Sequence, residues 1–567
     1  MSLIDWVILI GFIAFVVVYG IIKTRGKKDI NDYLLANRST PWYTVTLSIM
    51  ATQASAITFL STPGQAFADG MRFVQFYLGL PIAMIILSIT AVPIFHRLKV
   101  FTAYEYLEQR FDLKNRALGS ILFLIQRGLA TSFTILAPAL VISVLLGWDI
   151  HLTVIVTGIL VILYTTSGGT DAVNKTHILQ MSIIFIGMVA AFFMIVHSLP
   201  PDISLLDATK VAGKMNKLNV ITFDFDLKDR YNFWSGLIGG TFLALSYFGT
   251  DQSQVQRYLA GRSISESRMG LLANGIIKIP MQFGILFLGA MVFVFYQFVT
   301  PPLFFNPVEA NKVKTSVYGE EYKKLENSFS EIHSGMEHNL RQMIAAEKNN
   351  HQEQFNNSLA NIHQAQKQED EIKFKAKDLM KQANPGADTN DVNYVFLSFV
   401  INFLPAGLIG LILAAIFSAS MSSTSAALNS LASTTVIDIY KRLIKPSASE
   451  RHYLIASKLA TVFWGFFAIG FATIANRMGT LVEAVNILGS IFYGTILGIF
   501  LIAFYFRRIG GSATFYSAVF AELFVILCYA FTEIPYLWYN VIGCVILIVL
   551  AHILNPFFSR KSQVQTL

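Results

Sequence analysis

A dense run of small hydroxyl residues is the strongest chemical signal in this chain. Residues 418–425 are Ser-Ala-Ser-Met-Ser-Ser-Thr-Ser, and they lie inside an apolar segment. Hydroxyl side chains do not help a helix dissolve in lipid, but their oxygens can bind cations and their small size lets helices approach closely. In a chain made mostly of apolar segments, this combination indicates a cation-coupled transporter.

A second segment is also small and polar through its middle. Residues 48–59 are Ser-Ile-Met-Ala-Thr-Gln-Ala-Ser-Ala-Ile-Thr-Phe, and Pro63-Gly64 follows toward the end of the segment. A helix that unwinds there would free backbone carbonyls, which secondary transporters use together with hydroxyls to bind a cation near the midplane. Ser422 and Ser423 would supply the hydroxyls. The alternative for any one serine of the run is simply close helix packing.

Two cations lie deep inside apolar segments. Lys278 is roughly 15 Å from the end of its predicted helix, and Arg127 lies at a similar depth. Charge at such depth is costly and marks a functional site by default. For Arg127 the alternative is a structural partner or snorkelling toward the membrane surface. For Lys278 it is an ion pair with Glu483 across helices.

Composition defines the broad class. Charged residues make up only 14% of the chain and apolar residues 54%, whereas soluble domains are about a quarter charged. We therefore predict an all-α polytopic membrane protein. The sequence has no G-x-x-x-x-G-K-[ST] motif for direct ATP coupling and no nucleophile–base pair, so we expect no enzyme.

Thirteen apolar segments approach the ~20 residues that a bilayer requires. They lie at about 4–22, 43–67, 74–96, 118–146, 151–168, 177–199, 232–254, 270–299, 405–436, 453–474, 480–506, 512–532 and 535–556. Lys and Arg concentrate in alternate short loops, which predicts an outside N-terminus and an inside C-terminus. This one-sided distribution explains the net charge of +8 without a nucleic-acid partner.

Residues 306–393 are polar and interrupt this pattern. Leu325, Phe329, Ile332 and Met336 are spaced by threes and fours, and the pattern resumes after Lys348-Asn349-Asn350-His351. The spacing predicts an external amphipathic helical hairpin, packed on itself as a short antiparallel coiled coil. It would be a solvated lobe or a contact for self-association or a partner, with substrate capture as the alternative.

Several stretches resemble the sodium/solute symporter family. They occur in family order from about 30 to 510 and are Asp32–Ala36, Thr102–Phe111, Ser167–Gly169, Gln254–Leu259, Gly407–Ala415, Met421–Ser423, Leu428–Ser430 and Asp438–Tyr440. The resemblance implies a LeuT-like core of two inverted five-helix repeats that alternates access around a midplane site.

The resemblance also implies the order of parts along the chain. The expected parts are an extra N-terminal transmembrane helix and inner loop at 1–42, the first repeat at 43–199, an outer loop at 200–231, the start of the second repeat at 232–305, the hairpin at 306–393, the rest of the second repeat at 394–510, and two C-terminal helices with an inner tail at 511–567.

The family's sodium site corresponds to five positions of this sequence. The resemblance implies carbonyl ligands at Ala51, Ala54 and Ala419 and hydroxyl ligands at Ser422 and Ser423. Some members bind a second sodium through an Asp that follows a Thr, but here that position is His177, beside Lys175. Because a cation site there would be electrostatically poor, we predict one Na⁺ per cycle.

The family's sugar site is only partly kept. The resemblance places the gate tyrosine on Tyr247, a sugar-binding lysine on Lys278 and a polar amide on Asn486, whereas other sugar contacts are replaced by Thr58, Tyr77 and Ala244. A tyrosine such as Tyr247 would otherwise be a packed core residue. The loss of a pocket carboxylate while Lys278 and Arg127 remain favours an anionic solute.

We therefore expect a sodium-coupled symporter of the cell membrane that imports a small organic anion, such as a monocarboxylate or a sialic-acid-like acid. The predicted solute contacts are Thr58, Tyr77, Arg127, Tyr247, Lys278 and Asn486. One alternative is a sodium/sugar or polyol symporter. Another, of a different class, is a solute sensor or scaffold built on a transporter fold.

Overall fold

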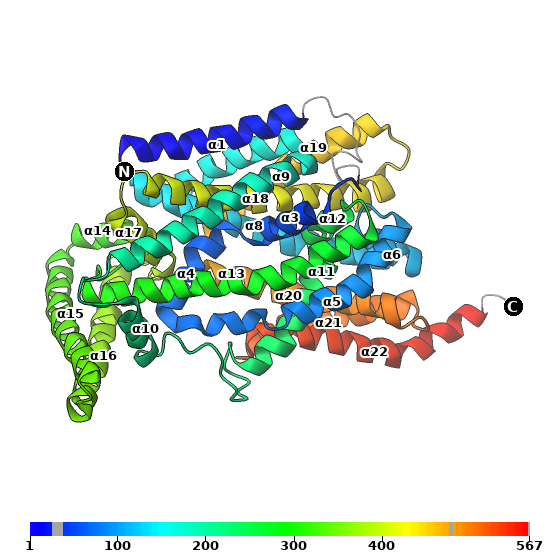
Figure 1. Ribbon diagram of the computed structural model, residues 1–567. Coiled ribbons are helices and arrows are strands. Elements are labelled where there is room, and N and C mark those ends of the chain that lie inside the picture. Colours follow the sequence, from blue (N-terminus) through cyan, green and yellow to red (C-terminus); the bar gives the residue numbers. More distant parts are fainter. Residues whose placement is uncertain (25–37, 476–479, 565–567) are drawn as a thin grey trace.

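The chain folds into a body of long helices with a helical hairpin at one end (Figure 1). The computed structural model describes residues 1–24, 38–475 and 480–564, with their side chains except at 20–21, 23–24, 167–175 and 559–564. Within these ranges the regular structure is helical and no β-strand occurs. The predicted all-α class is therefore confirmed for the described part of the chain.

Up to the middle of the body, the helices are α1 (Leu3–Thr24), α3 (Trp42–Gln53), α4 (Ala56–Asp69), α5 (Leu80–Ile89), α6 (Ala91–Leu98), α7 (Ala103–Arg110), α8 (Leu113–Leu146), α9 (Ile150–His197) and α10 (Leu205–Lys214). The later helices are α11 (Gly240–Gly249), α12 (Gln252–Leu259), α13 (Ile264–Phe298), α17 (Val395–Phe403), α18 (Leu408–Thr434), α19 (Glu450–Ala475), α20 (Leu481–Tyr505), α21 (Gly511–Phe531) and α22 (Tyr536–Val564).

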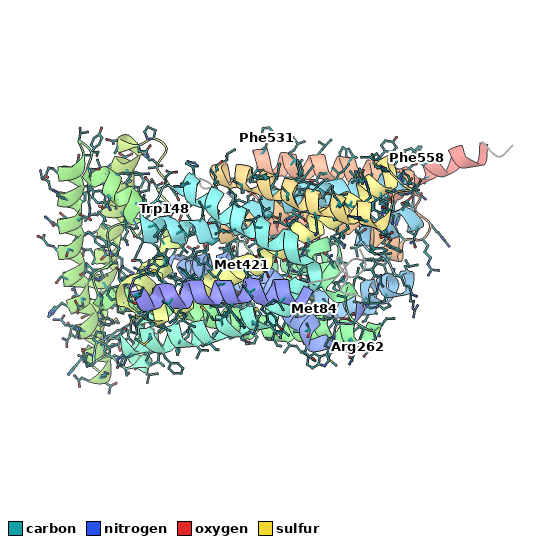
Figure 2. All side chains as sticks on the ribbon, turned by 90° about the horizontal axis from the view of Figure 1, so that it is seen from above. Met84, Trp148, Arg262, Met421, Phe531 and Phe558 are labelled. Atoms are coloured by element: carbon teal, nitrogen blue, oxygen red, sulfur yellow. The ribbon has the colours of Figure 1, made fainter. Side chains whose placement is uncertain are left out.

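Nine segments in the described ranges are long and apolar enough to cross a membrane, whereas thirteen spans were predicted. Four shorter apolar helices occur at Leu3–Tyr19, Ile150–Thr166, Ser235–Gly249 and Val392–Phe403. Large apolar side chains such as Leu160, Phe193 and Phe531 are exposed on the helical body, and Figure 2 shows Phe531 at its edge. An exposed apolar surface of this kind is suited to lipid contact.

The long helix α9 is sharply bent. The hydroxyl oxygens of Tyr164 and Thr176 lie 3.0 Å apart, although twelve residues of straight helix would separate them by roughly 18 Å. The arms 150–166 and 176–197 are therefore separate segments. They correspond to the spans predicted at 151–168 and 177–199.

Two helices of the body are broken where the sequence is small and polar. The chain leaves the helical conformation at Ala54 and Ser55, between α3 and α4. It does so again at Thr250 and Asp251, between α11 and α12. Pro63, by contrast, lies inside α4, because the break occurs at the small residues before it. The four residues at the two breaks are all buried.

The polar insertion forms the short helix α14 (Pro307–Lys314) and the long helices α15 (Gly319–Lys348) and α16 (Gln352–Ala383). The long helices pack side by side (Figure 1), and Phe329, Met336 and Ile362 are buried along the seam. A buried polar contact also crosses the seam, since His333 Nδ1 lies 2.8 Å from Glu369 Oε1. The threefold and fourfold spacing of apolar residues thus describes the packed face of the hairpin.

After the hairpin, a short 3₁₀ turn at Val392–Tyr394 (η4) rests on α4. Asn393 Oδ1 accepts a hydrogen bond of 3.2 Å from the backbone N–H of Leu481, where α20 begins. A Cβ atom added at Gly64 of α4 would overlap the carbonyl oxygen of Val392. The absence of a side chain at Gly64 therefore permits η4 to approach α4 closely.

We expect Gly64→Ala to lower the thermal unfolding temperature of the detergent-solubilised protein. Its methyl group would meet backbone, which cannot rotate away, and overpacking of this kind costs about 1–3 kcal/mol. The matched control is Gly284→Ala in α13, where the added Cβ has nothing within 4 Å. Equal melting temperatures for the two variants would show that η4 does not rest on α4 at Gly64.

Candidate functional site

Four of the five residues predicted to bind sodium meet where α18 packs beside the break between α3 and α4, and the fifth, Ala54, lies at the break itself. Ser422 Oγ lies 2.8 Å from the carbonyl oxygen of Ala51 and 3.1 Å from that of Ala419. Ser423 Oγ lies 3.0 Å from the same Ala419 oxygen. Two segments about 370 residues apart in sequence thus contribute to one cluster of oxygens.

Local backbone structure explains why these oxygens are available. Ala54 ends α3 with ψ near 80°, so its carbonyl no longer follows the helical hydrogen-bond direction. Ser422 and Ser423 lie three and four residues after Ala419, the spacing at which a serine hydroxyl bonds back to a helix carbonyl. Ala51, Ala54, Ala419, Ser422 and Ser423 are all buried.

The chemistry of these oxygen atoms fits a monovalent cation. Carbonyl and hydroxyl oxygens are the hard, uncharged ligands that secondary transporters use for Na⁺. In the described structure the two hydroxyls are hydrogen-bonded to the same carbonyls that would bind the ion. A bound Na⁺ would replace those hydrogen bonds with oxygen–metal contacts. The assignment of these five residues to sodium remains a prediction.

A small cavity of about 120 Å³ adjoins this cluster. Ser423 belongs to both, and the α3–α4 break contributes Thr52, Gln53 and Ser55 to the cavity wall. Five of the six predicted solute contacts line the cavity, namely Thr58, Tyr77, Arg127, Tyr247 and Asn486. The remaining lining residues are Ile57, Phe76, Gln126, Thr131, Thr134, Leu243, Ser253, Ala427, Val482, Val485 and Tyr493.

Lys278 lies outside this lining. It is 1% exposed, and its Nζ lies 5.8 Å from the centroid of the Tyr77 ring, a cation–π arrangement. Tyr77 itself lines the cavity, so Lys278 lies against a residue of the wall. The alternative partner Glu483 bonds elsewhere, because its Oε1 accepts from Arg230 at 2.9 Å and from the Tyr231 hydroxyl at 3.3 Å.

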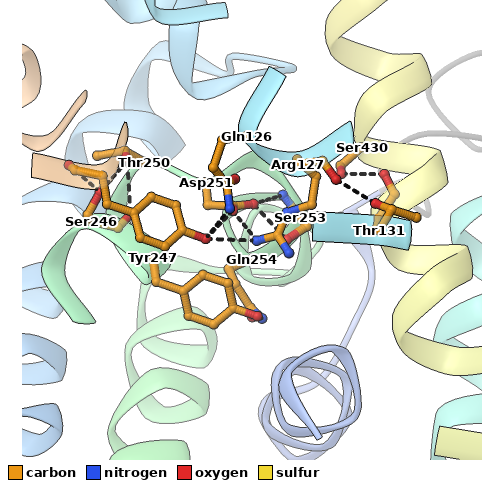
Figure 3. A network of polar contacts seen from close by, with 12 residues as sticks. Gln126, Arg127, Thr131, Ser246, Tyr247, Thr250, Asp251, Ser253, Gln254 and Ser430 are labelled. Atoms are coloured by element: carbon orange, nitrogen blue, oxygen red, sulfur yellow. Dashed lines mark hydrogen bonds and ion pairs between the residues drawn. The ribbon is translucent and has the colours of Figure 1, made fainter. Parts of the chain in front are cut away.

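Arg127 is held in a network of buried polar groups that connects three segments (Figure 3). Its Nη2 bonds the carboxylate of Asp251, which lies at the break between α11 and α12. The hydroxyl of Tyr493 on α20 lies 3.1 Å from Arg127 Nη2 and donates to Asp251 Oδ2 at 2.9 Å. The guanidinium carbon lies 5.4 Å from the centroid of the Tyr247 ring.

Sequence reasoning missed Asp251 and Tyr493. The same principle that identified Arg127, a charge deep in an apolar segment, applies equally to a carboxylate. Asp251 lies at the end of the predicted span 232–254 and could have been identified as the partner of Arg127. Tyr493 could not, because nothing in an aromatic residue of an apolar segment distinguishes a hydrogen-bonding tyrosine from a packed one.

The position of the family's second sodium ligand is occupied by a buried imidazole. His177 Nδ1 lies 3.1 Å from Ser48 Oγ, and the neighbouring Thr176 hydroxyl contacts Tyr164. The side chain of Lys175 lies outside the described residues. One sodium per cycle therefore remains a prediction.

Comparison with known proteins assigns the family. The sequence profile of the sodium:solute symporter family matches residues 33–321 and 372–520, most of the chain. The chain belongs to the sodium:solute symporter family. This membership places it among multi-pass, sodium-coupled membrane transporters, and the relatives described below are transporters and not enzymes.

The relatives differ in the solutes that their names state. The chain is 28% identical to sodium-coupled monocarboxylate transporter 1 of Xenopus laevis over 491 residues, which is 85% of this chain but 64% of that protein. It is 24% identical to the sodium/sialic acid symporter SiaT of Proteus mirabilis, across 99% of this chain and 96% of that protein.

A solved structure of a substrate-bound, outward-open Na⁺-coupled sialic acid symporter has the same fold. It superimposes with a TM-score of 0.73 at 22% sequence identity, covering 98% of each chain. At this identity the likeness concerns the fold alone. It supports the expected LeuT-like helical arrangement and leaves the membrane orientation and the number of spans as predictions.

We expect Ser422→Ala and Ser423→Ala each to raise the sodium concentration for half-maximal effect, on the order of tenfold. Each variant removes one hydroxyl oxygen without adding bulk, and a hydrogen bond or ligand of this kind contributes about 1–1.5 kcal/mol. The measurement is a sodium titration of thermal stability, since ligand binding stabilises the native state.

The matched control is Ser430→Ala on the same helix, whose hydroxyl bonds only the carbonyl of Ala427, at 2.7 Å, among the described hydrogen bonds. It should leave the sodium dependence unchanged. Unaltered sodium affinity in both Ser422→Ala and Ser423→Ala would move the ion site elsewhere.

Proposed function

We propose that this protein is a sodium-coupled symporter of the cell membrane that imports a small organic anion by alternating access, with one sodium per cycle. The observation that carries the proposal is the juxtaposition of two sites. A cluster of uncharged oxygens around Ala51 and Ser422 adjoins a cavity into which Arg127 projects a guanidinium group. Ser423 belongs to both, so an ion and an anion would bind next to each other.

The geometry supports a simple order of events. Sodium would connect the α3–α4 break to α18 and fix both in the arrangement that binds solute. Solute would then contact the α8, α11 and α20 residues around the cavity and permit closure. The coupling is reciprocal, so solute would strengthen sodium binding by the same factor by which sodium strengthens solute binding. Release of sodium on the side where it is dilute would therefore weaken solute binding.

The size of the cavity favours a small acid. About 120 Å³ is well below the roughly 300–1,000 Å³ of pockets that hold drug-sized ligands. A monocarboxylate of a few carbons is therefore a better first candidate than a nine-carbon sugar acid, which would need the wall around Phe76 and Tyr77 to move. The names of the relatives include both classes of solute.

A sodium/sugar or polyol symporter is the second candidate. Three side-chain amides line the cavity, at Gln53, Gln126 and Asn486. The Oε1 atoms of Gln53 and Gln126 are buried without a hydrogen-bond partner in the described structure. Amide oxygens are suitable acceptors for sugar hydroxyls. An anion, however, would pair its negative charge with the Arg127 guanidinium group, which a neutral sugar cannot do.

Uptake into liposomes containing the purified protein tests the proposal. With sodium outside and potassium inside, we expect accumulation of an acid from a panel of acetate, lactate, pyruvate, pantothenate and N-acetylneuraminate, and none with potassium on both sides. Accumulation of glucose or a polyol alone would favour the second candidate. Sodium-dependent binding without accumulation would favour a sensor or scaffold.

We expect Lys278→Ala to weaken binding of the accumulated solute more than binding of sodium. Loss of the charge beside Tyr77 would alter the cavity wall and leave the oxygens around Ser422 intact. Lys278→Met is the matched variant, because it keeps an unbranched side chain only one atom shorter and removes the charge. If Met restores solute affinity, or if both ligands weaken equally, Lys278 is a packing residue.

A further inference from the structure

We infer that Asp251 is a fixed counter-ion that makes binding of an anionic solute depend on sodium. The inference rests on the proposed function and concerns the same cavity. It assigns to Asp251 a positioning and charge-balancing role that acts through Arg127.

The Asp251 carboxylate is fully engaged inside the protein. It is 1% exposed. Its Oδ2 accepts from Arg127 Nη2 and from the Tyr493 hydroxyl. Its Oδ1 accepts from the backbone N–H of Ser253 at 2.8 Å and from the Ser253 hydroxyl at 2.6 Å. With four donors on two oxygens, the carboxylate is bonded on both oxygens inside the protein and is not displaced at low cost.

Arg127 retains donors for a ligand. A guanidinium group has five N–H donors, and the described bonds of Arg127 to Asp251 and Tyr493 both use Nη2. Its Nε is buried and has no hydrogen-bond partner in the described structure, and the residue, which is 9% exposed, lines the cavity. A solute carboxylate could accept from this unused Nε–H donor while Asp251 stays in place on Nη2.

The total charge then decides when an anion binds. Arg127 is the one charged side chain among the described residues that line the cavity, and Asp251 cancels its charge. An anion that entered alone would leave an uncompensated negative charge among buried groups, which is costly. Sodium in the adjoining oxygen cluster supplies the missing positive charge. Sodium and anion therefore stabilise each other, and the charges of Arg127, Asp251, the sodium ion and the anion sum to zero.

Three variants separate this role from simple packing. Asp251→Asn keeps the size of the side chain and removes its charge, Arg127→Gln removes the opposite charge, and the double variant restores the balance. Lys278, behind the Tyr77 ring, is the same in every variant, so its charge cancels from the comparison.

The first measurement is a sodium titration of thermal stability of the full-length protein without solute. Asp251→Asn should raise the half-maximal sodium concentration on the order of tenfold, because an unbalanced positive charge in a low-dielectric region repels the ion. Arg127→Gln should lower it, and the double variant should return it close to the wild-type value. If both single variants weaken sodium binding and the double variant is worse than either, the two residues are structural and the inference is wrong.

The second measurement uses lactate as the probe. In the wild-type protein lactate should raise the melting temperature only when sodium is present, whereas in Asp251→Asn it should do so in potassium as well. A sodium requirement in Asp251→Asn equal to that of the wild type would overturn the inference. If no acid of the uptake panel binds the wild type with or without sodium, the proposed solute class fails and the inference falls with it.

That failure can be told apart from a wrong role for Asp251. The sodium titrations need no solute, and they show by themselves whether the charges of Asp251 and Arg127 affect sodium binding.

Discussion

The structure depends on how the backbone polar groups at the break between α3 and α4 are hydrogen-bonded inside a membrane. A backbone carbonyl that leaves its helix in hydrocarbon costs several kcal/mol unless another group bonds it. Here the hydroxyl of Ser422 lies 2.8 Å from the carbonyl of Ala51, and Ser423 contacts Ala419 on its own helix. The break, the hydroxyl run of α18 and the small residues that allow α18 to come so close therefore require one another.

The second break, between α11 and α12, is stabilised differently. Asp251 begins α12 by accepting the N–H of Ser253, and its other oxygen bonds Arg127 and Tyr493. Buried ion pairs seldom stabilise a protein more than apolar packing of the same volume would. Function therefore explains this pair better than stability does. Its position beside the cavity makes charge, rather than shape alone, a criterion for what can bind.

The sequence was sufficient for features that depend on local composition. The segments 418–425 and 48–59 stood out because small polar residues are rare in apolar helices, and the structure brings them together at Ser422 and Ala51. It was insufficient for contacts between segments distant in sequence. The 124 residues between Arg127 and Asp251 carry no periodic signal of their pairing, and Glu483 bonds Arg230 from an irregular loop instead of Lys278. The predicted span 232–254 is likewise a single continuous segment, although the helix is broken at Thr250.

Charge balance also favours the predicted single sodium. On the proposed function, Arg127 and Asp251 cancel, so one Na⁺ and one monovalent anion complete a neutral site. A second sodium would leave one positive charge uncompensated in a region where desolvation makes net charge costly. The position where some family members place a second sodium ligand holds His177, bonded to Ser48, and offers an imidazole in place of a carboxylate. A carboxylate at this position would both bind a second sodium and balance its charge, so the change to His177 removes both functions together.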